Sequence, residues 1–192
     1  MKPAVFLDKD GTLLDDVPYN VDPGKMRLAP GAADALATFA RMNVPIIVIS
    51  NQSGVALGKF DEAALVEVER KLHELAANAG ARLAGVYWCP HHPQGTVPRY
   101  ARACDCRKPA PGMIERAARE LRLDLQRSWF VGDILDDIEA GHRAGCRAVL
   151  IDNGNETLWQ RGPMREPDAI AKDMREAARI IERAWHETEL ET

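Results

Sequence analysis

Residues 6–13 read Phe-Leu-Asp-Lys-Asp-Gly-Thr-Leu, and the interpretation of the whole chain starts from this stretch. Two carboxylates, Asp8 and Asp10, follow a short apolar strand, and Gly11 permits a tight turn beside them. One carboxylate of such a pair can attack phosphorus while the other donates and accepts protons. An ordinary Asp-rich turn is the alternative, which the position directly after an apolar strand disfavours.

Short, nearly continuous apolar runs recur along the chain and alternate with helical patterns. The predicted strands cover residues 4–7, 46–49, 85–88, 129–131 and 148–151. The predicted helices cover residues 31–42, 61–78, 111–121, 136–144 and 168–186. Such runs are typical of strands buried on both faces of a parallel sheet, and their alternation with helices indicates βαβ units. We therefore predict an α/β fold, a three-layer, doubly wound, mostly parallel sheet, in a single domain over residues 1–192 without a large cap domain.

The composition excludes several classes of partner. The chain has 192 residues and a formal net charge of −4, which argues against nucleic acid or an acidic membrane as a partner. No apolar run approaches the roughly 20 residues that span a bilayer, and the start does not resemble a signal peptide. We expect a cytoplasmic monomer.

Two further polar groups follow predicted strands, where ligands bind in sheets of this kind. Residues 50–54 read Ser-Asn-Gln-Ser-Gly, and the Ser50 hydroxyl with nearby backbone N–H groups can hold phosphate oxygens. Arg107 and Lys108 precede a predicted helix N-terminus, which itself favours anions. Lys108 can neutralise charge on a transferring phosphoryl group. The alternative for residues 50–54 is an ordinary polar turn, and the alternative for Arg107 and Lys108 is a solvated basic turn.

An acidic cluster follows the predicted strand at residues 129–131. Magnesium prefers oxygen ligands and needs only a few carboxylates besides phosphate, so Asp133 together with Asp8 suits such a site. Asp136 and Asp137 lie at the start of the next predicted helix. The sequence favours a helix N-terminal acid without a metal role for Asp136, and for Asp137 it leaves open whether the residue is such an acid or part of the site.

Along the chain an acid pair, a hydroxyl, a lysine and a further acid follow one another, each at a predicted strand end. This pattern resembles that of the haloacid dehalogenase-like (HAD) phosphohydrolase superfamily. The resemblance covers nearly all of the chain up to about residue 151. It implies a HAD-like Rossmannoid fold, with Asp8 as nucleophile and Asp10 as general acid and base. It also implies that Ser50 and Lys108 bind the phosphoryl group. Asp8, the Asp10 carbonyl and Asp133 would hold Mg²⁺.

A Cys-x-His and a Cys-x-Cys pair lie close together in the segment 89–106. The candidate ligands are Cys89, His91, Cys104 and Cys106. Four such ligands suit a closed, tetrahedral, structural zinc site, which would stabilise the loop just before Lys108. His92 is adjacent and stays unassigned, and free cysteines with a surface histidine are the alternative.

The segment Cys-Pro-His-His-Pro … Cys-Asp-Cys-Arg-Lys-Pro looks like one HAD branch, the D,D-heptose 1,7-bisphosphate phosphatases. The related histidinol-phosphate phosphatases usually have a shorter insert than the 12 residues between His91 and Cys104. The resemblance implies removal of the 7-phosphate of a heptose bisphosphate, a step in lipopolysaccharide precursor synthesis. Leu14 and the run 16–20 depart from the branch pattern. The implied substrate contacts are Asp16, Tyr19, Asn51, Gln52, Ser53 and Arg107.

Three rival functions stay open at this stage. The first is a phosphatase of the same fold acting on histidinol phosphate or another small sugar phosphate. The second is a non-enzymatic phospho-receiver domain, which usually carries its phosphorylated Asp at the third strand rather than the first. The third is a zinc-stabilised binding protein with a decayed site, against which the complete set of polar residues argues.

Overall fold

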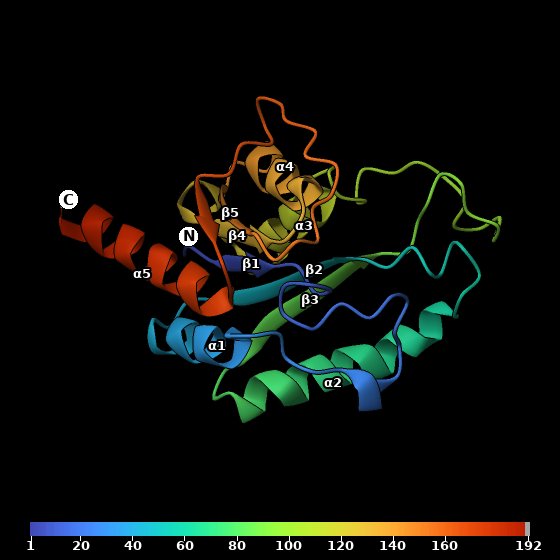
Figure 1. Ribbon diagram of the computed structural model, residues 1–192, viewed down its shortest axis with the longest axis horizontal. Helices are drawn as coiled ribbons and strands as arrows, with labels where there is room; N and C mark the ends of the chain where they lie inside the picture. Colours follow the sequence, from blue (N-terminus) through green and yellow to red (C-terminus); the bar gives the residue numbers. More distant parts are fainter. Residues whose placement is uncertain (191–192) are drawn as a thin grey trace.

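Six strands form one parallel sheet in the computed structural model, which describes residues 1–190 (Figure 1). Their order across the sheet is β3 (Leu83–Cys89), β2 (Ile46–Asn51), β1 (Val5–Leu7), β4 (Trp129–Gly132), β5 (Arg147–Ile151) and β6 (Ala169–Ala171). The chain winds outward in both directions from the central β1. The carboxyl ends of β1, β2 and β4 therefore meet at the switch point where such sheets bind ligands.

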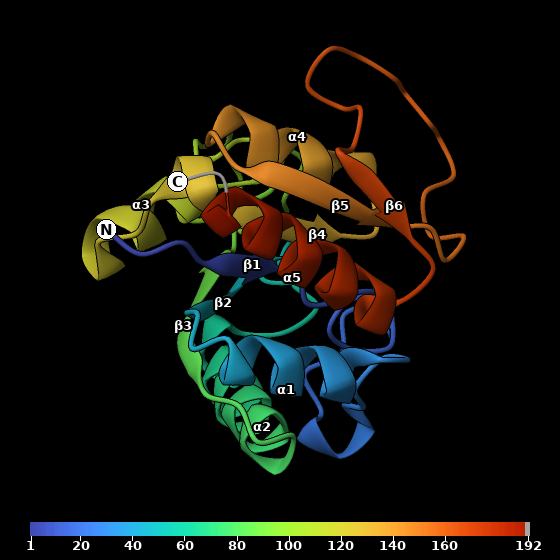
Figure 2. The ribbon, with the colours of Figure 1, turned by 90° about the vertical axis from the view of Figure 1, so that its left-hand side faces the viewer.

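Helices cover both faces of this sheet, which gives the three predicted layers (Figure 2). On one face lie α1 (Ala32–Arg41), α2 (Leu65–Asn78) and α5 (Met174–Leu190), and on the other lie α3 (Gly112–Leu121) and α4 (Leu135–Arg143). Alternate residues of β1 serve the two faces: Val5 and Leu7 belong to the first core and Phe6 to the second. Both faces of the central strand are thus buried, as its continuous apolar character predicts.

Helix packing follows the apolar spacing of the sequence. In α2 the buried residues Leu65, Val68, Leu72 and Ala76 recur at three- and four-residue intervals, which places them on one stripe. At the start of α1, Gly31 has φ +76°, and a Cβ there would lie 2.7 Å from the backbone nitrogen of Arg175 in α5. Glycine at this position therefore permits the close approach of α1 and α5.

The five predicted strands are confirmed, but the helix predicted over residues 168–186 is wrong at its start. Residues there form β6, which pairs with β5, and α5 begins only after it. The Asp168 carboxylate accepts a hydrogen bond from the Ala148 N–H (2.7 Å), and the Asp173 carboxylate accepts one from a backbone N–H in the first turn of α5 (2.8 Å). These residues thus pair with the open edge of β5 instead of continuing as a helix, because the pairing satisfies the backbone hydrogen-bonding groups of β5.

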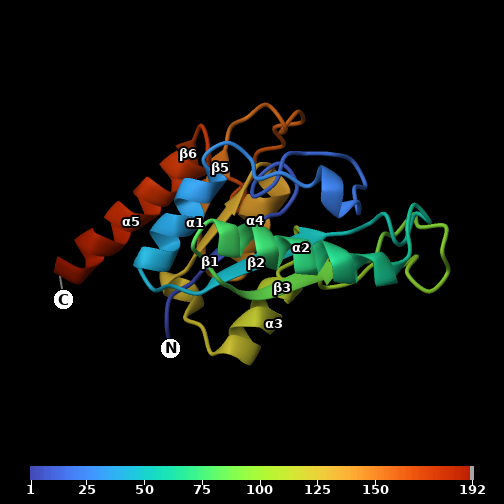
Figure 3. The same ribbon diagram turned by 90° about the horizontal axis from the view of Figure 1, so that it is seen from below.

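The long connections lie at the carboxyl ends of the strands. Figures 1 and 3 show both chain ends on one side of the molecule and the segment 90–110 projecting on the opposite side. Within residues 1–190 the inserts are loops rather than a cap domain, as predicted. No helix in this range is long and apolar enough to cross a bilayer. The predicted domain extends to Thr192, and residues 191–192 lie outside the described part.

Candidate active site

A buried cluster of three carboxylates and one ammonium group lies at the carboxyl ends of β1 and β4. The Lys108 Nζ lies 2.5 Å from Asp8 Oδ1 and 2.6 Å from Asp137 Oδ1, and it donates a third hydrogen bond to the Ile49 carbonyl (3.2 Å). Carboxylate oxygens of Asp8, Asp133 and Asp137 lie within 4.8 Å of one another. All four side chains are buried, so their charges interact at low dielectric.

The charges of this cluster do not cancel. Burial raises the pKa of Asp8 well above its usual value; Lys108 opposes the rise, and the neighbouring Asp137 and Asp133 add to it. Burial alone would lower the pKa of Lys108, but Asp137 and Asp8 outweigh burial and raise it, so the ammonium group keeps its proton. Three carboxylates against one ammonium leave a formal charge of −2. A divalent cation that prefers oxygen ligands would neutralise this excess negative charge.

Asp133 is held in place through both of its oxygens. Oδ1 accepts a hydrogen bond from the Thr12 hydroxyl (2.9 Å), and Oδ2 accepts one from the Asn155 side-chain amide (2.6 Å). Burial and the charge of Asp137 raise the pKa of Asp133 to about 6, although these two hydrogen bonds oppose the rise. A Cβ at Gly11, where φ is +81°, would lie 2.3 Å from Asp133 Oδ2. Glycine is thus required for the β1 turn to approach this carboxylate.

The loop at residues 153–167, whose role the sequence does not indicate, reaches back to the site. Besides the Asn155 contact, the Asn153 side chain donates to the Gly11 carbonyl (2.8 Å), and Glu156 accepts from the first backbone N–H of α4 (2.7 Å). Sequence reasoning missed Asn155 as a site residue. No strand-end position marks it, because it reaches the cluster only through the path of the loop.

The structure decides between the two acids at the start of α4. Asp137 is fully buried; one oxygen contacts Lys108, and the other accepts a hydrogen bond from the Asp133 N–H (3.2 Å). Asp137 therefore caps the helix and also holds the lysine. Asp136 instead pairs with Arg165 (2.9 Å) outside the cluster. Asp137 thus has a role of its own, in the ion pair with Lys108 and at the helix start. The resemblance to the superfamily makes Asp8 and Asp133 the candidate metal ligands of the cluster.

Asp10 belongs to a second network beside the cluster. The Gln52 side-chain amide donates to the Ser50 hydroxyl (2.8 Å) and to Asp10 Oδ2 (3.3 Å), which links the ends of β1 and β2. Lys9 is buried with its Nζ 2.5 Å from Asp10 Oδ1. The Asp10 side chain keeps 34% of its surface exposed, so it can exchange protons with a ligand or water. Lys9, which the sequence did not single out, supplies the positive charge that faces this acid.

The segment before α3 is fastened to the end of β2. Asn51 Oδ1 accepts from the Lys108 N–H (3.0 Å), and the Asn51 amide donates to the Lys108 carbonyl (3.1 Å). The neighbouring Arg107 donates through its guanidinium to the His91 carbonyl (3.5 Å). The side chain of Asn51 therefore positions the backbone of Lys108, a structural contact in a residue predicted to bind substrate.

The other predicted substrate contacts lie outside these networks. Asp16 and Tyr19 lie in the exposed part of the loop after β1, where Lys59 Nζ approaches the Tyr19 ring at 5.7 Å. Ser53 is half-buried in the turn after β2. Among the described residues, no hydrogen bond or ion pair joins Asp16, Tyr19 or Ser53 to the carboxylate cluster.

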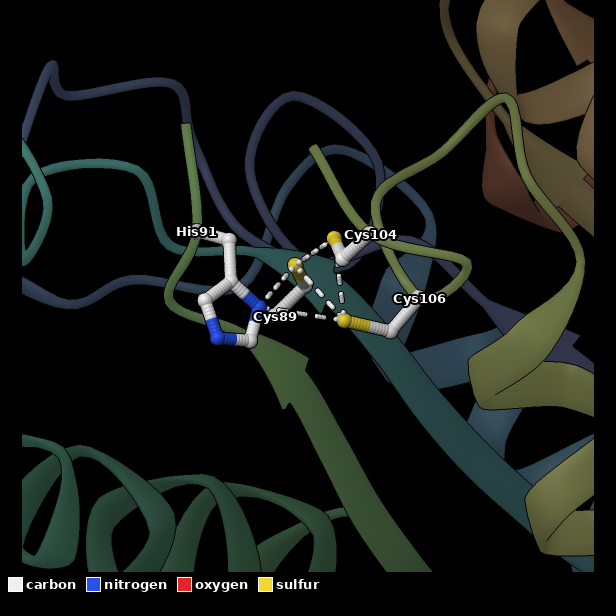
Figure 4. Close-up of side chains that lie close together, drawn as sticks. All are labelled: Cys89, His91, Cys104 and Cys106. Atoms are coloured by element: carbon white, nitrogen blue, oxygen red, sulfur yellow. Dashed lines mark hydrogen bonds between the residues drawn. The ribbon is translucent and has the colours of Figure 1, made fainter. Parts of the chain in front are cut away.

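The predicted zinc ligands converge at the end of β3 (Figure 4). The Cys89 sulfur lies 3.5 Å from that of Cys104 and 3.0 Å from that of Cys106, and the latter two lie 3.3 Å apart. His91 Nδ1 lies 3.6 Å from the Cys89 sulfur and 3.4 Å from the Cys106 sulfur. Ligands of a tetrahedral zinc ion are about 3.4–3.8 Å apart, given Zn–S bonds near 2.3 Å. Three of the five distances lie in this range, and the two from the Cys106 sulfur to the other sulfurs are shorter. The four groups are thus gathered as a closed zinc site requires, and the cluster would widen at Cys106 to hold the ion.

Local contacts support this choice of ligands. The Arg107 N–H approaches the Cys104 sulfur at 3.3 Å. Burial would raise the pKa of Cys104, but the hydrogen bonds from Cys106 and Arg107 outweigh it and lower the pKa, which favours the thiolate that binds metal. Burial raises the pKa of Cys89 and of Cys106, so Cys104 is the cysteine of the cluster that ionises most readily without metal. His92 is not in the cluster; its Nδ1 accepts from the Gln94 N–H (3.1 Å) in a turn. The adjacent histidine left unassigned by the sequence thus has a local structural role.

Comparisons with known proteins agree with this geometry. A HAD-hydrolase-like family model matches residues 105–177. The D-glycero-beta-D-manno-heptose-1,7-bisphosphate 7-phosphatase of Escherichia coli (strain K12) is 38% identical over 167 residues, which cover 87% of this chain and 84% of that protein. The corresponding protein of Vibrio cholerae is 35% identical, covering 84% of this chain and 87% of its own length. The chain belongs to this family of HAD-like phosphatases.

Solved structures of the same family share the fold. The D,D-heptose 1,7-bisphosphate phosphatase from B. bronchiseptica, complexed with magnesium and phosphate, superimposes with a TM-score of 0.81 at 33% identity. That alignment covers 96% of this chain and 99% of the other. The enzyme from Burkholderia thailandensis gives a TM-score of 0.66 at 28% identity, covering 93% and 97%. The resemblance stated from the sequence motifs is therefore confirmed, and the receiver-domain alternative is set aside.

Proposed function

We propose that this protein removes the 7-phosphate of D-glycero-β-D-manno-heptose 1,7-bisphosphate through an aspartyl-phosphate on Asp8. The observation that carries the proposal is the contact of the buried Asp8 carboxylate with Lys108 at 2.5 Å, next to Asp133. In the proposal Asp8 is the nucleophile, Lys108 is the cation for the phosphoryl group and Asp133 is a further carboxylate. The closeness of these three side chains at the carboxyl ends of β1 and β4 supports these roles. The names of the relatives supply the substrate.

The proposed reaction has two steps. In the first, an Asp8 oxygen attacks phosphorus, the bond from phosphorus to the sugar oxygen breaks, and Asp10 gives its proton to that oxygen. In the second, Asp10 takes a proton from water as the water attacks the aspartyl-phosphate, which releases inorganic phosphate and regenerates Asp8. Lys108 and the Ser50 hydroxyl hold the phosphoryl oxygens during both steps.

Two metals have separate roles in this proposal. Asp8, Asp133 and the Asp10 carbonyl would hold Mg²⁺, which neutralises charge on the phosphoryl group when bound. Zinc would be structural, since three cysteines and one histidine leave no ligand position for water. The Cys104 contact to the Arg107 N–H then ties the zinc loop to the residue next to Lys108.

The sugar and its second phosphate would contact the loops around the cluster. Arg107 supplies a cation near the zinc loop, and Asp16 and Tyr19 supply exposed polar groups after β1. We propose that the enzyme works in the cytoplasm on heptose precursors of lipopolysaccharide. The candidate substrate contacts are Arg107, Asp16, Tyr19, Asn51, Gln52 and Ser53.

A substrate panel tests this assignment. Heptose 1,7-bisphosphate, histidinol phosphate and hexose phosphates are compared by kcat/KM with MgCl₂ and after chelation. We expect the heptose bisphosphate to exceed the others by at least about 100-fold, since a second phosphate offers charge-assisted hydrogen bonds worth a few kcal/mol. Equal rates on all substrates would refute the heptose assignment while leaving the phosphatase chemistry intact.

Magnesium should stabilise the protein more at neutral than at acidic pH. The pKa of Asp133 is raised to about 6 by burial and Asp137, against about 3.9 in an unfolded chain. The folded state therefore binds this proton more tightly than the unfolded chain does. The free energy of unfolding falls as pH rises from about 4 to about 6, and this loss of stability remains at higher pH. Mg²⁺ offsets this loss of stability only at pH values at which the Asp133 carboxylate is ionised.

Melting temperatures measured with and without MgCl₂ at about pH 5 and about pH 7.5 check this prediction. The increase caused by MgCl₂ should be larger at the higher pH, and Asp133→Asn should reduce it there. An increase of the same size at both pH values would contradict the proposed role of Asp133.

A further inference from the structure

A cavity of about 650 Å³ lies between the end of β3, the zinc loop and the start of α3. Figure 3 shows α3 beside β3, with the zinc loop projecting past the end of the strand. The lining residues include the zinc-cluster residues His91 and Cys106 but none of Asp8, Lys108 and Asp133. The cavity is therefore distinct from the catalytic cluster, and neither the predicted roles nor the proposed reaction uses it.

The lining is rich in positive charge. It contains four arginines, Arg99, Arg102, Arg116 and Arg119, and two acids, Glu62 and Asp105. The chain as a whole carries a formal net charge of −4, so this concentration of cations runs against the overall balance. Four guanidinium groups against two carboxylates give the lining a formal charge of +2, and Glu62 accepts a hydrogen bond from the Tyr100 hydroxyl (2.5 Å). The lining thus keeps a surplus of guanidinium donors.

Two of these guanidinium groups are held by aromatic rings. The Arg99 guanidinium carbon lies 5.2 Å from the centre of the Tyr100 ring, and that of Arg116 lies 5.5 Å from the centre of the Tyr87 ring. A guanidinium that stacks on an aromatic face keeps its in-plane N–H groups available for an anion. Stacking therefore orients the Arg99 donors without consuming them, whereas Arg116 also forms an ion pair with Glu120 (2.8 Å).

Among the residues that the structure describes, three of the four arginines form no ion pair. Arg116 pairs with Glu120 (2.8 Å), whereas the Arg102 guanidinium approaches the His91 ring nitrogen Nε2 (2.9 Å). Among the side chains that the structure describes, Arg99, Arg102 and Arg119 form no ion pair. Unpaired arginines that converge on one cavity are the arrangement that proteins use to bind phosphate groups.

We propose that this cavity binds a small molecule that carries two or more phosphate charges. Its volume lies within the roughly 300–1,000 Å³ of small-molecule sites. The arginines without an ion pair among the described residues, Arg99, Arg102 and Arg119, supply charge-assisted donors that match phosphate oxygens in pairs. Since the zinc loop forms one wall and continues into Arg107 and Lys108, the ligand would lie next to the segment that carries the catalytic lysine. The proposal does not depend on the identity of the substrate.

Inorganic pyrophosphate is the probe, titrated calorimetrically into the zinc-loaded full chain at low salt without magnesium. The pocket variant is the double substitution Arg99→Gln with Arg119→Gln, which spares the contact to His91. Arg41→Gln, at the exposed end of α1, is the matched control for loss of a surface charge. Lys108→Met removes the cation of the catalytic cluster and tests binding there. Zinc content and melting temperature are measured for each variant.

The pocket variant should bind pyrophosphate at least about tenfold more weakly, while Arg41→Gln and Lys108→Met bind within about twofold of the parent protein. Three results would each overturn the proposal. One is the absence of binding to the parent at millimolar pyrophosphate. Another is loss of binding in Lys108→Met with the pocket variant unchanged, which assigns the anion to the catalytic cluster. The third is an equal loss in Arg41→Gln, which indicates non-specific attraction.

Discussion

Asp8→Asn should lower kcat by at least about 10⁴-fold, because the amide cannot form the acyl phosphate that the two-step reaction requires. The fold should persist, since asparagine has the same shape and its side-chain oxygen can still accept the Lys108 hydrogen bond. The substitution also removes one charge from a cluster in which burial and neighbouring acids raise the pKa of Asp8. The melting temperature without magnesium should therefore stay the same or rise.

Steady-state kinetics and intact-protein mass spectrometry check this result. The parent protein quenched during turnover should show a phosphorylated fraction that Asp8→Asn lacks. Asp34→Asn, an exposed acid in the first turn of α1, is the control and should keep parental kinetics. Retained activity in Asp8→Asn, or phosphate found on another residue, would contradict the covalent mechanism.

Cys104→Ala should release zinc and destabilise the protein. The sulfur is a member of the four-ligand cluster, and it also accepts the Arg107 N–H hydrogen bond. A three-ligand site holds zinc weakly, and the loop then loses the bond that closes it. A loss of about 4 kcal/mol corresponds to a melting temperature lower by roughly 8–16 °C in a chain of this size. The value of kcat should fall too, because the loop leads into Lys108.

Metal analysis and thermal unfolding measure both effects. Cys146→Ala is the matched control, because Cys146 is a buried cysteine outside the zinc cluster. It should retain one zinc per chain and lose less stability than Cys104→Ala. If Cys104→Ala kept its zinc and its melting temperature, the cluster would not be a structural metal site.

Much of the site was predictable because its residues follow strands. Continuous apolar runs identify strands buried on both faces, and parallel strands bring their carboxyl ends to one edge of the sheet. The positions of Asp8, Ser50 and Asp133 at that edge follow from these two facts. The Cys-x-His and Cys-x-Cys spacings predicted the zinc cluster in the same way, since each pair is local in sequence.

The sequence by itself therefore determined the alternation of the first five strands with helices, the acid pair at the end of the first strand and the four candidate zinc ligands. Only the tertiary structure decided that Asp137 rather than Asp136 holds Lys108, because one step along a helix turns a side chain by about 100°. It also decided that residues 169–171 form a strand, since the open edge of β5 offers partners no local pattern reveals. Asn155 reaches Asp133 for the same physical reason: contacts between distant segments depend on the path of the whole chain.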